Sequence, residues 1–141
     1  MIVAFQVLGD PHSKGRPRFG KGRTYTDKAD VAYERAVGFL ARAAMHGVPP
    51  FAGPVALTVV AVHARPQRRP ECVPVDAWKQ GARVAAVTVG DIDNKIKAAS
   101  DAMNGIVYYD DRQVVAIQAW SLFAASGESP RVEVRVESVY P

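Results

Sequence analysis

Five aspartates fall within GDIDNKIKAASDAMNGIVYYDD, the stretch from Gly90 to Asp111, although the chain as a whole has a formal net charge of +4. Asp91 and Asp93 are two residues apart, and Lys97 follows Asp93 by four. Side chains four residues apart lie on the same face of a helix. A helix that starts near Asp93 therefore brings one ammonium group beside two carboxylates.

A second acidic pair, Asp110–Asp111, lies in IVYYDDRQVV, a pattern typical of a hairpin turn between strands at 106–109 and 113–123. If this turn packs beside the start of the helix, a third carboxylate joins the first two. Three carboxylates held together repel one another unless a cation lies among them. Mg²⁺ and Mn²⁺ prefer oxygen ligands, and a carboxylate-bound Mg²⁺ can also take the phosphate oxygens of a phosphodiester. Lys97 would then stabilise negative charge on the transition state or on the leaving oxygen.

The same side chains also have a purely structural interpretation. Asp91 and Asp93 can cap a helix, and Lys97 can form an ion pair with the aspartate one turn before it. Asp110–Asp111 are common turn formers. The pattern alone leaves this interpretation and the metal site equally open.

Three neighbouring residues are assigned to the surroundings of the site. Asp101 also lies four residues from Lys97, and for it we favour a helix-surface ion pair over a metal ligand. Asp110 precedes Asp111 directly and is expected to support the site from a second layer. Asn94 either orients a ligand or caps the helix, and the sequence does not separate these two roles.

A Gly-rich basic segment, SKGRPRFGKGRTY, precedes the first predicted helix. Its basic side chains can follow phosphates, and Phe19 and Tyr25 can stack on exposed bases. A solvated charged loop is the alternative. Beside a carboxylate metal site, DNA binding is the better explanation, because one segment would hold the backbone that the other cuts. The candidate DNA contacts are Lys14, Arg16, Arg18, Lys21 and Arg23, and Arg65, Arg68 and Arg69 are expected to extend this surface.

The hydrophobic pattern predicts the elements that must position these groups. Strands are predicted at 1–9, 54–64, 113–123 and 131–139, a short one within 83–89, and helices at 27–46 and from about 93 to 105. The segment 65–89 is Pro- and Arg-rich in its first half, and we expect it to be a mobile insertion loop. Together these elements predict a single α+β domain over 1–141, with a mixed, mostly antiparallel sheet and two helices packed on one face.

The side chains that face the core follow from the same periodicity. Alternation in RVEVRVESV points three valines inward, at 132, 134 and 136. If GDID is extended, Asp91 and Asp93 leave the same face and Ile92 points into the core. The apolar stripes predicted for the two helices consist of Tyr33, Val37, Leu40, Ala41 and Ala44 in the first, and of Ile96, Ala99 and Met103 in the second.

Composition limits the remaining classes. With 141 residues, 48% of them hydrophobic, the chain fits one domain with a substantial core. Its apolar stretches are far shorter than the roughly 20 residues of a membrane-spanning helix, and its N-terminus has the apolar run before the charges, the reverse of a secretory signal. Cys72 is the only cysteine, and His12, His46 and His63 lack metal-ligand spacing. We therefore expect a cytoplasmic protein without membrane association, and a pI near 9.4 suits a polyanionic partner.

DIDNKIKAASDAMNGIVYYDDRQVV resembles the signature of the RusA-type Holliday junction resolvases, or crossover junction endodeoxyribonucleases, which are common in phages and bacterial prophages. That signature combines Asp-x-Asp-Asn, a Lys three residues after the Asn, an Asn-Gly helix end, and Asp-Asp before a Gln-Val-Val strand. KGRPRF also resembles a segment of phage members. The resemblance covers most of the chain and is weakest over 65–89.

The resemblance implies a homodimeric, Mg²⁺-dependent endodeoxyribonuclease, with Mn²⁺ as a substitute, that cuts four-way DNA junctions by paired symmetric nicks in recombination and repair. It assigns metal binding and catalysis to Asp91, Asp93 and Asp111, and an essential lysine to Lys97. A two-fold dimer suits two symmetric cuts.

Two departures from the family pattern leave other functions open. Relatives often carry a basic residue just before the first Asp, where this chain has Val89 and Gly90. They also often carry a Lys on the strand after Asp-Asp, which VVAIQAWSLFAA lacks. The alternatives are a less selective nuclease for flaps and other branched DNA, a DNA-junction-binding protein with a weak nuclease, and a structural domain with an acidic turn.

Overall fold

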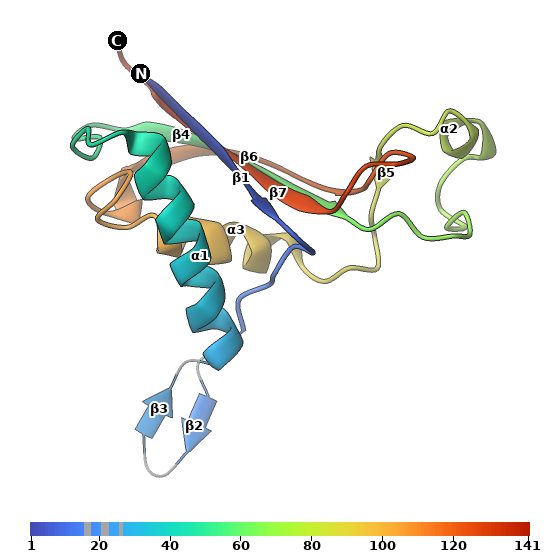
Figure 1. Cartoon of the computed structure of the whole chain (residues 1–141), viewed down its shortest axis with the longest axis horizontal. Coiled ribbons are helices and arrows are strands. Elements are labelled where there is room, and N and C mark those ends of the chain that lie inside the picture. The colour runs from blue at the N-terminus through green and yellow to red at the C-terminus, as the bar shows by residue number, and fades with distance from the viewer. Residues whose placement is uncertain (16–17, 21–22, 26) are drawn as a thin grey trace.

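The computed structural model describes residues 1–15, 18–20, 23–25 and 27–141, and it is built on a five-stranded sheet with the order β1-β7-β4-β6-β5 (Figure 1). β4 and β6 pair in parallel, and the other neighbours pair antiparallel. The expected mixed, mostly antiparallel sheet is confirmed. The strands are β1 Ile2–Leu8, β4 Val55–His63, β5 Val84–Ala85, β6 Val114–Phe123 and β7 Arg131–Ser138.

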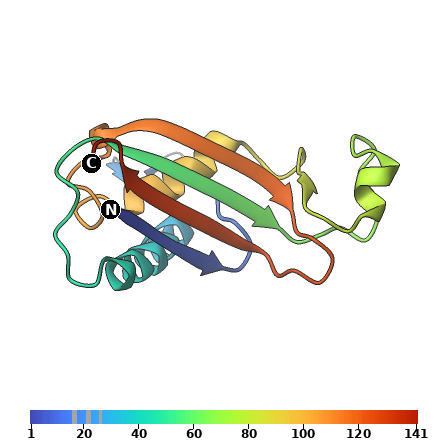
Figure 2. The same cartoon turned by 90° about the horizontal axis from the view of Figure 1, so that it is seen from above.

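Two helices, α1 (Lys28–Met45) and α3 (Ile92–Ala102), cover the same face of the sheet, as predicted (Figure 2). α1 packs along β1, whereas α3 lies under β4 and β6. The start of α1 follows from Asp27, whose carboxylate accepts a hydrogen bond from the N–H of Ala29. No helix in the described residues has the length and apolar character needed to cross a membrane.

The core lies between the sheet and the two helices. Val132, Val134 and Val136 point into it from β7, as the alternating pattern predicts. Val37 and Ala41 of α1 are fully buried, and the rest of the predicted stripe packs around them. In the part of the chain that the structure describes, no helix covers the opposite face of the sheet (Figure 2).

The segment 65–89 contains the short helix α2 (Val75–Lys79) and β5. It has a small apolar cluster of its own, formed by Val73 and Val84 with Phe123 of β6. The guanidinium of Arg65 stacks 3.8 Å from the ring centroid of Trp78. Its N–H groups also donate to three backbone carbonyls, those of Trp78, Ala82 and Ala124. Arg65 therefore holds this segment together, and the mobility of the segment stays a prediction.

The expected strand at 106–109 is wrong. This segment forms turns at the end of α3, where the N–H of Gly105 (φ 76°) donates to the carbonyl of Tyr108 at 2.8 Å. The ring of Tyr108 is fully buried, and its hydroxyl donates to the Ser100 carbonyl at 2.6 Å. Burial against the helix outweighs the strand propensity of IVYY. A 3₁₀ turn, η1 (Asp111–Gln113), then leads into β6 in place of a hairpin.

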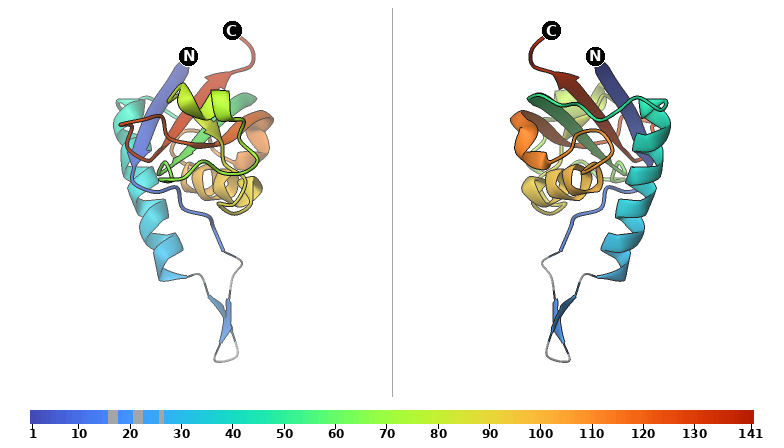
Figure 3. Two further views of the ribbon diagram at one scale, coloured as in Figure 1. Left: turned by 90° about the vertical axis from the view of Figure 1, so that its right-hand side faces the viewer. Right: turned by 90° about the vertical axis from the view of Figure 1, so that its left-hand side faces the viewer.

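A second, two-stranded sheet forms a projecting arm, which consists of β2 (Arg18–Gly20) and β3 (Arg23–Tyr25) (Figure 3). These strands lie in the segment that the sequence predicts to bind DNA. Of the predicted contacts, Arg18 begins β2 and Arg23 begins β3, while Arg16 and Lys21 lie outside the described residues.

Candidate active site

The start of α3 presents three charged side chains to solvent. Asp91 is the N-cap residue and has an extended backbone (φ −78°, ψ 134°), Asp93 lies in the first turn, and Lys97 lies one turn later. The expectation that Ile92 points into the core is wrong: the helix begins at Ile92, and this side chain is 38% exposed. The turn before the helix needs Gly90, whose φ of 90° is strained for any residue with a side chain.

These three groups make none of the structural contacts that the sequence allows them. The Asp91 carboxylate accepts no capping hydrogen bond. No ion pair joins Asp93 to Lys97 within the described part of the chain, although they are four residues apart. The remaining structural effect is the attraction of the carboxylates to the positive end of the helix, which contributes about 0.3–1 kcal/mol. Both carboxylates and the ammonium are therefore available to a ligand.

Lys95 is the residue that the sequence interpretation missed. Its side chain is buried (3% exposed), and its Nζ donates to the carbonyls of Val89 at 2.7 Å and Gly90 at 3.2 Å. Burial lowers the pKa of Lys95, and the nearby Asp91 carboxylate partly opposes this shift. The ammonium thus fixes the backbone immediately before Asp91. The sequence does contain a pattern that predicts the burial of Lys95. Lys95 is the first residue of an i, i+3, i+4, i+7 stripe whose other members, Ala98, Ala99 and Ala102, are buried.

The chain that leads into the arm is fixed to both helices by Lys14. Its backbone N–H donates to the Asn94 carbonyl at 3.2 Å. Its ammonium lies 2.8 Å from Glu34 on α1 and 2.8 Å from Asp101 on α3. Partial burial works against the charge, but these two carboxylates raise the pKa of Lys14 above its ordinary value. The base of the arm therefore lies beside the first turn of α3.

This arrangement changes the assignment of two residues. The expected ion pair between Asp101 and Lys97 is wrong, because Asp101 binds Lys14 instead. Lys14 was expected to contact DNA, but its ammonium is held by two carboxylates and is 19% exposed. Asn94 contributes its backbone carbonyl to the arm junction.

Asp110 has a structural role in the turn before β6. Its carboxylate accepts hydrogen bonds from the backbone N–H of Arg112 at 2.9 Å and from the Arg112 guanidinium at 3.1 Å. These bonds, the backbone one first, lower the pKa of Asp110. Gln113 completes a capping box by accepting from the Asp110 N–H. The turn-forming interpretation therefore describes Asp110 well.

Asp111 lies near the end of α3, not near its start. The residues around it contact the beginning of β4: Gln113 donates to the Phe51 carbonyl at 2.7 Å, and Val114 pairs with Val55. The start of α3 is instead near the end of β4, where His63 is buried. Burial lowers the pKa of His63, and the nearby charge of Lys95 lowers it further, which places Lys95 close to this end of the strand. α3 has 11 residues, so its two ends are about 16 Å apart.

The acidic turn thus packs at the opposite end of the helix from the one expected. Among the described residues, no group of three or more His, Cys, Asp or Glu side chains is placed to hold a metal ion. Asp91 and Asp93 offer oxygen ligands of the kind that Mg²⁺ prefers. The donor chemistry fits the metal, but Asp111 of the same chain does not reach it.

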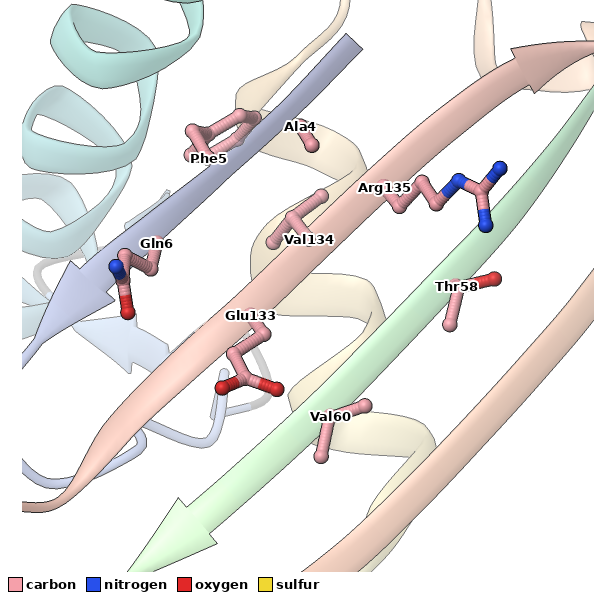
Figure 4. A pocket seen from close by; sticks show the side chains of 8 residues that line it. All are labelled: Ala4, Phe5, Gln6, Thr58, Val60, Glu133, Val134 and Arg135. Carbon is pink, nitrogen blue, oxygen red and sulfur yellow. The ribbon is translucent and has the colours of Figure 1, made fainter. Parts of the chain in front are cut away.

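The site is an exposed surface. A hollow on the open face of the sheet is lined by side chains that include Thr58, Glu133 and Arg135, and it contains none of the predicted catalytic residues (Figure 4). An exposed site suits a large polymeric substrate better than a small molecule, which usually binds in a concave pocket.

Comparison with known proteins identifies the family of the chain. The family model described as endodeoxyribonuclease RusA matches residues 9–137. The chain therefore belongs to the RusA endodeoxyribonuclease family, a family of nucleases that act on branched DNA and generally depend on divalent metal ions. The chain is also similar to the uncharacterized protein YqaN of Bacillus subtilis (strain 168), with 28% identity over 140 residues that cover 97% of this chain and 96% of YqaN.

Proposed function

We propose that this protein is a Mg²⁺-dependent endodeoxyribonuclease that resolves four-way DNA junctions by paired symmetric nicks in recombination and repair. One observation supports this most strongly. Asp91, Asp93 and Lys97 stand exposed at the start of α3, their side chains make no hydrogen bond or ion pair among the described residues, and the base of a basic arm lies beside them.

Each group at this site has a role in the proposal. Asp91 and Asp93 would hold Mg²⁺, or Mn²⁺ in its place, and the bound metal would supply Lewis-acid activation at the scissile phosphate. Asp111 is the third proposed ligand, although within one chain it does not reach the other two. Lys97 would stabilise the negative charge that develops on the leaving oxygen. Lys95 is a positioning residue, because it fixes the backbone before Asp91.

The arm would supply most of the affinity for DNA. Basic side chains that follow phosphates bind independently of sequence, and this binding weakens as salt increases. Lys14 fixes the base of the arm to α3, so a DNA backbone bound along the arm would pass close to the carboxylates. The side chains proposed to contact phosphates are Arg16, Arg18, Lys21 and Arg23.

The experiment compares an end-labelled four-way junction with a linear duplex of matching sequence, each in Mg²⁺ or in EDTA. Wild-type protein should nick the junction at two symmetric positions in Mg²⁺ alone. Asp93→Asn should abolish cleavage while leaving junction binding intact. Asp76→Asn, the same change at an exposed aspartate of α2, should cleave like wild type. Cleavage that survives both EDTA and Asp93→Asn would contradict the proposal.

A second candidate is a junction-binding protein whose nuclease is weak. Two observations favour it: the three carboxylates do not meet within one chain, and neither Val89 nor Gly90 supplies a basic group before Asp91. Tight junction binding without nicks under every metal condition would select this candidate. Equal cutting of flaps and four-way junctions would instead indicate a less selective nuclease.

A further inference from the structure

A hollow lies in the segment 65–89, close to the start of α3. The segment projects beyond the end of the sheet and leads directly into α3 (Figure 1). The hollow has a volume of about 530 Å³, and the residues that line it include Pro66, Arg68, Pro70, Val87, Thr88 and Phe123. Ligand pockets in proteins measure about 300–1,000 Å³, so this hollow has room for a small planar ring system.

The walls of the hollow are mostly apolar, and hydrogen bonds within the segment fix one of them. Val87 is 67% exposed, whereas Phe123 is buried and forms the floor. The guanidinium of Arg69 donates to the Val73 carbonyl at 2.7 Å, and the Val73 N–H donates to the Pro70 carbonyl at 3.0 Å. The turn that carries Pro70 is therefore held in place before any ligand binds.

The hollow adjoins the candidate active site along the chain. Thr88 lies three residues before Asp91, so the Cα atoms of these residues are at most about 11 Å apart. The backbone between them is fixed, because Lys95 binds the two carbonyls before Asp91. Consecutive bases of a stacked strand are about 3.4 Å apart along the axis, so this distance corresponds to about three nucleotides. A strand bound at Asp91 and Asp93 would therefore have its next nucleotides within reach of the hollow.

Two charged residues line the hollow, and they favour a nucleotide as its ligand. Arg68 is exposed and makes no side-chain hydrogen bond or ion pair among the described residues, so it is available to a phosphate. It brings a basic group to a place where Val89 and Gly90 supply none. Glu71 carries a carboxylate, which repels phosphates but accepts hydrogen bonds from the amino groups of bases.

We infer that this hollow is a nucleotide subsite, which takes one unstacked base of the DNA strand beside the scissile phosphate while Arg68 binds the phosphate of that nucleotide. This inference rests on the proposed function. Apolar walls hold a base that has left the stack by contact with its flat faces. The segment 65–89, which contributes no proposed catalytic residue, thereby has a role in substrate recognition.

The subsite would favour four-way junctions over linear duplexes. A base inside a duplex has to leave its stack to enter the hollow, and the cost of unstacking is smallest where pairing or stacking is already broken. At the crossover of a four-way junction the strands change partners, so the bases beside it leave the stack more readily. Entry of a base would therefore direct cutting to the crossover.

Fluorescence of 2-aminopurine, a base analogue that brightens when it leaves the stack, tests base entry directly. Nicks made by wild-type protein in Mg²⁺ first locate the cut. The analogue then replaces, one at a time, the three bases on either side of the cut, in a four-way junction and in a duplex of matching sequence. Asp93→Asn protein, which should bind without cutting, is added to saturation. We expect a several-fold rise at one position of the junction and no rise in the duplex.

Two matched variants, each combined with Asp93→Asn, test whether the base enters this hollow. Val87→Glu places a charge in the hollow and should abolish the rise at saturating protein. Val75→Glu makes the same change at an exposed residue of α2 that does not line the hollow, and it should retain the rise. Both side chains are exposed, so both variants should keep a native circular dichroism spectrum.

The salt dependence of junction binding tests the phosphate contact of Arg68. Loss of one phosphate contact makes the slope of log K against log salt concentration less steep by about 0.9. We expect this change for Arg68→Ala with an unmodified junction. Arg135→Ala removes an exposed arginine on the open face of the sheet and should keep the wild-type slope. An unchanged slope for Arg68→Ala would overturn the assignment of this residue.

The outcomes separate the subsite from the function on which it rests. If wild-type protein cuts junctions but no position brightens, or if Val87→Glu retains the rise, only the subsite fails, and the hollow suits an apolar side chain of a protein instead. Loss of the rise in both valine variants also overturns the subsite. If wild-type protein neither binds nor cuts junctions, both proposals fail. A rise that Val75→Glu retains and Val87→Glu loses establishes the subsite.

Discussion

The hydroxyl of Tyr108 should be measurable as a contribution to stability, because it makes one defined contact in a fully buried place. It donates to the Ser100 carbonyl at 2.6 Å and holds the segment that leads to Asp111 against the end of α3. Tyr108→Phe keeps the ring and removes only this contact. The Ser100 carbonyl retains a second hydrogen bond, from the N–H of Met103 at 3.2 Å, so it is not left without a partner.

The expected loss follows from these contacts. A typical net hydrogen bond contributes about 0.5–1.5 kcal/mol, and the short distance and full burial favour the upper part of that range. We expect Tyr108→Phe to lower the free energy of unfolding by about 1–1.5 kcal/mol, because one of the two hydrogen bonds to the Ser100 carbonyl remains. For a domain of this size, that loss lowers Tm by about 3–6 °C.

The pH dependence gives an independent check. Burial, with smaller contributions from Asp111 and Asp101, raises the pKa of Tyr108 above its ordinary value. A tyrosine whose pKa is raised on folding stabilises the protein below the pKa of the unfolded chain, near 10, and this contribution is lost as pH rises further. The difference between wild type and Tyr108→Phe should therefore narrow above about pH 10.

Urea unfolding followed by circular dichroism at pH 7 measures the effect, with the adjacent Tyr109→Phe as control. Tyr109 is 61% exposed, so its variant should lie within about 0.5 kcal/mol of wild type. Equal losses in the two variants, or no loss in Tyr108→Phe, would refute the reasoning from burial and hydrogen bonding.

Three further predictions concern contacts elsewhere in the fold. Lys95→Met should weaken Mn²⁺ binding several-fold in calorimetry with a native circular dichroism spectrum; unchanged affinity would remove its positioning role. Hydrogen bonds from Arg83 lower the pKa of Glu128 to about 2. Glu128→Gln should therefore be less stable than wild type at pH 7, and this difference in the free energy of unfolding should shrink as pH falls from about 4.5 to 2. Acid unfolding measures it, and a difference that stays constant over this range would argue against the ion pair. Arg65→Ala removes hydrogen bonds to three carbonyls and the stacking on Trp78, and it should destabilise the segment 65–89 by about 1–3 kcal/mol. Limited proteolysis should then cut faster within 65–89. Resistance equal to that of wild type would show that other contacts hold the segment.

Elements with a regular pattern could be predicted from the sequence. The three inward valines of β7 and the apolar stripe of α1 follow from periods of 2 and 3.6, and the structure has both. The pairing of the strands could not be predicted in this way. Nothing local in the sequence of β6 indicates that it pairs in parallel with β4, because that choice is made by the long connection through α3.

The errors at the site have a common cause in contacts between residues far apart in the chain. Asp101 could pair with Lys97 by spacing alone, but Lys14, 87 residues away, takes its carboxylate. IVYY has the composition of a strand, yet Tyr108 finds a buried place against α3. The spacing of Asp91, Asp93 and Lys97 was informative because one short helix positions all three.

The strand order has a consequence for how the chain folds during synthesis. In the described sheet β1 is an edge strand whose only strand partner is β7, with Ile2 opposite Glu137 and Leu8 opposite Arg131. At about 5–20 residues per second, the ribosome needs roughly 6–25 s to extend the chain from the end of β1 to the start of β7. During that interval the first strand made has an apolar face and no sheet to join. Its earliest partner is α1, so a β1–α1 unit would wait for the last strand to complete the fold.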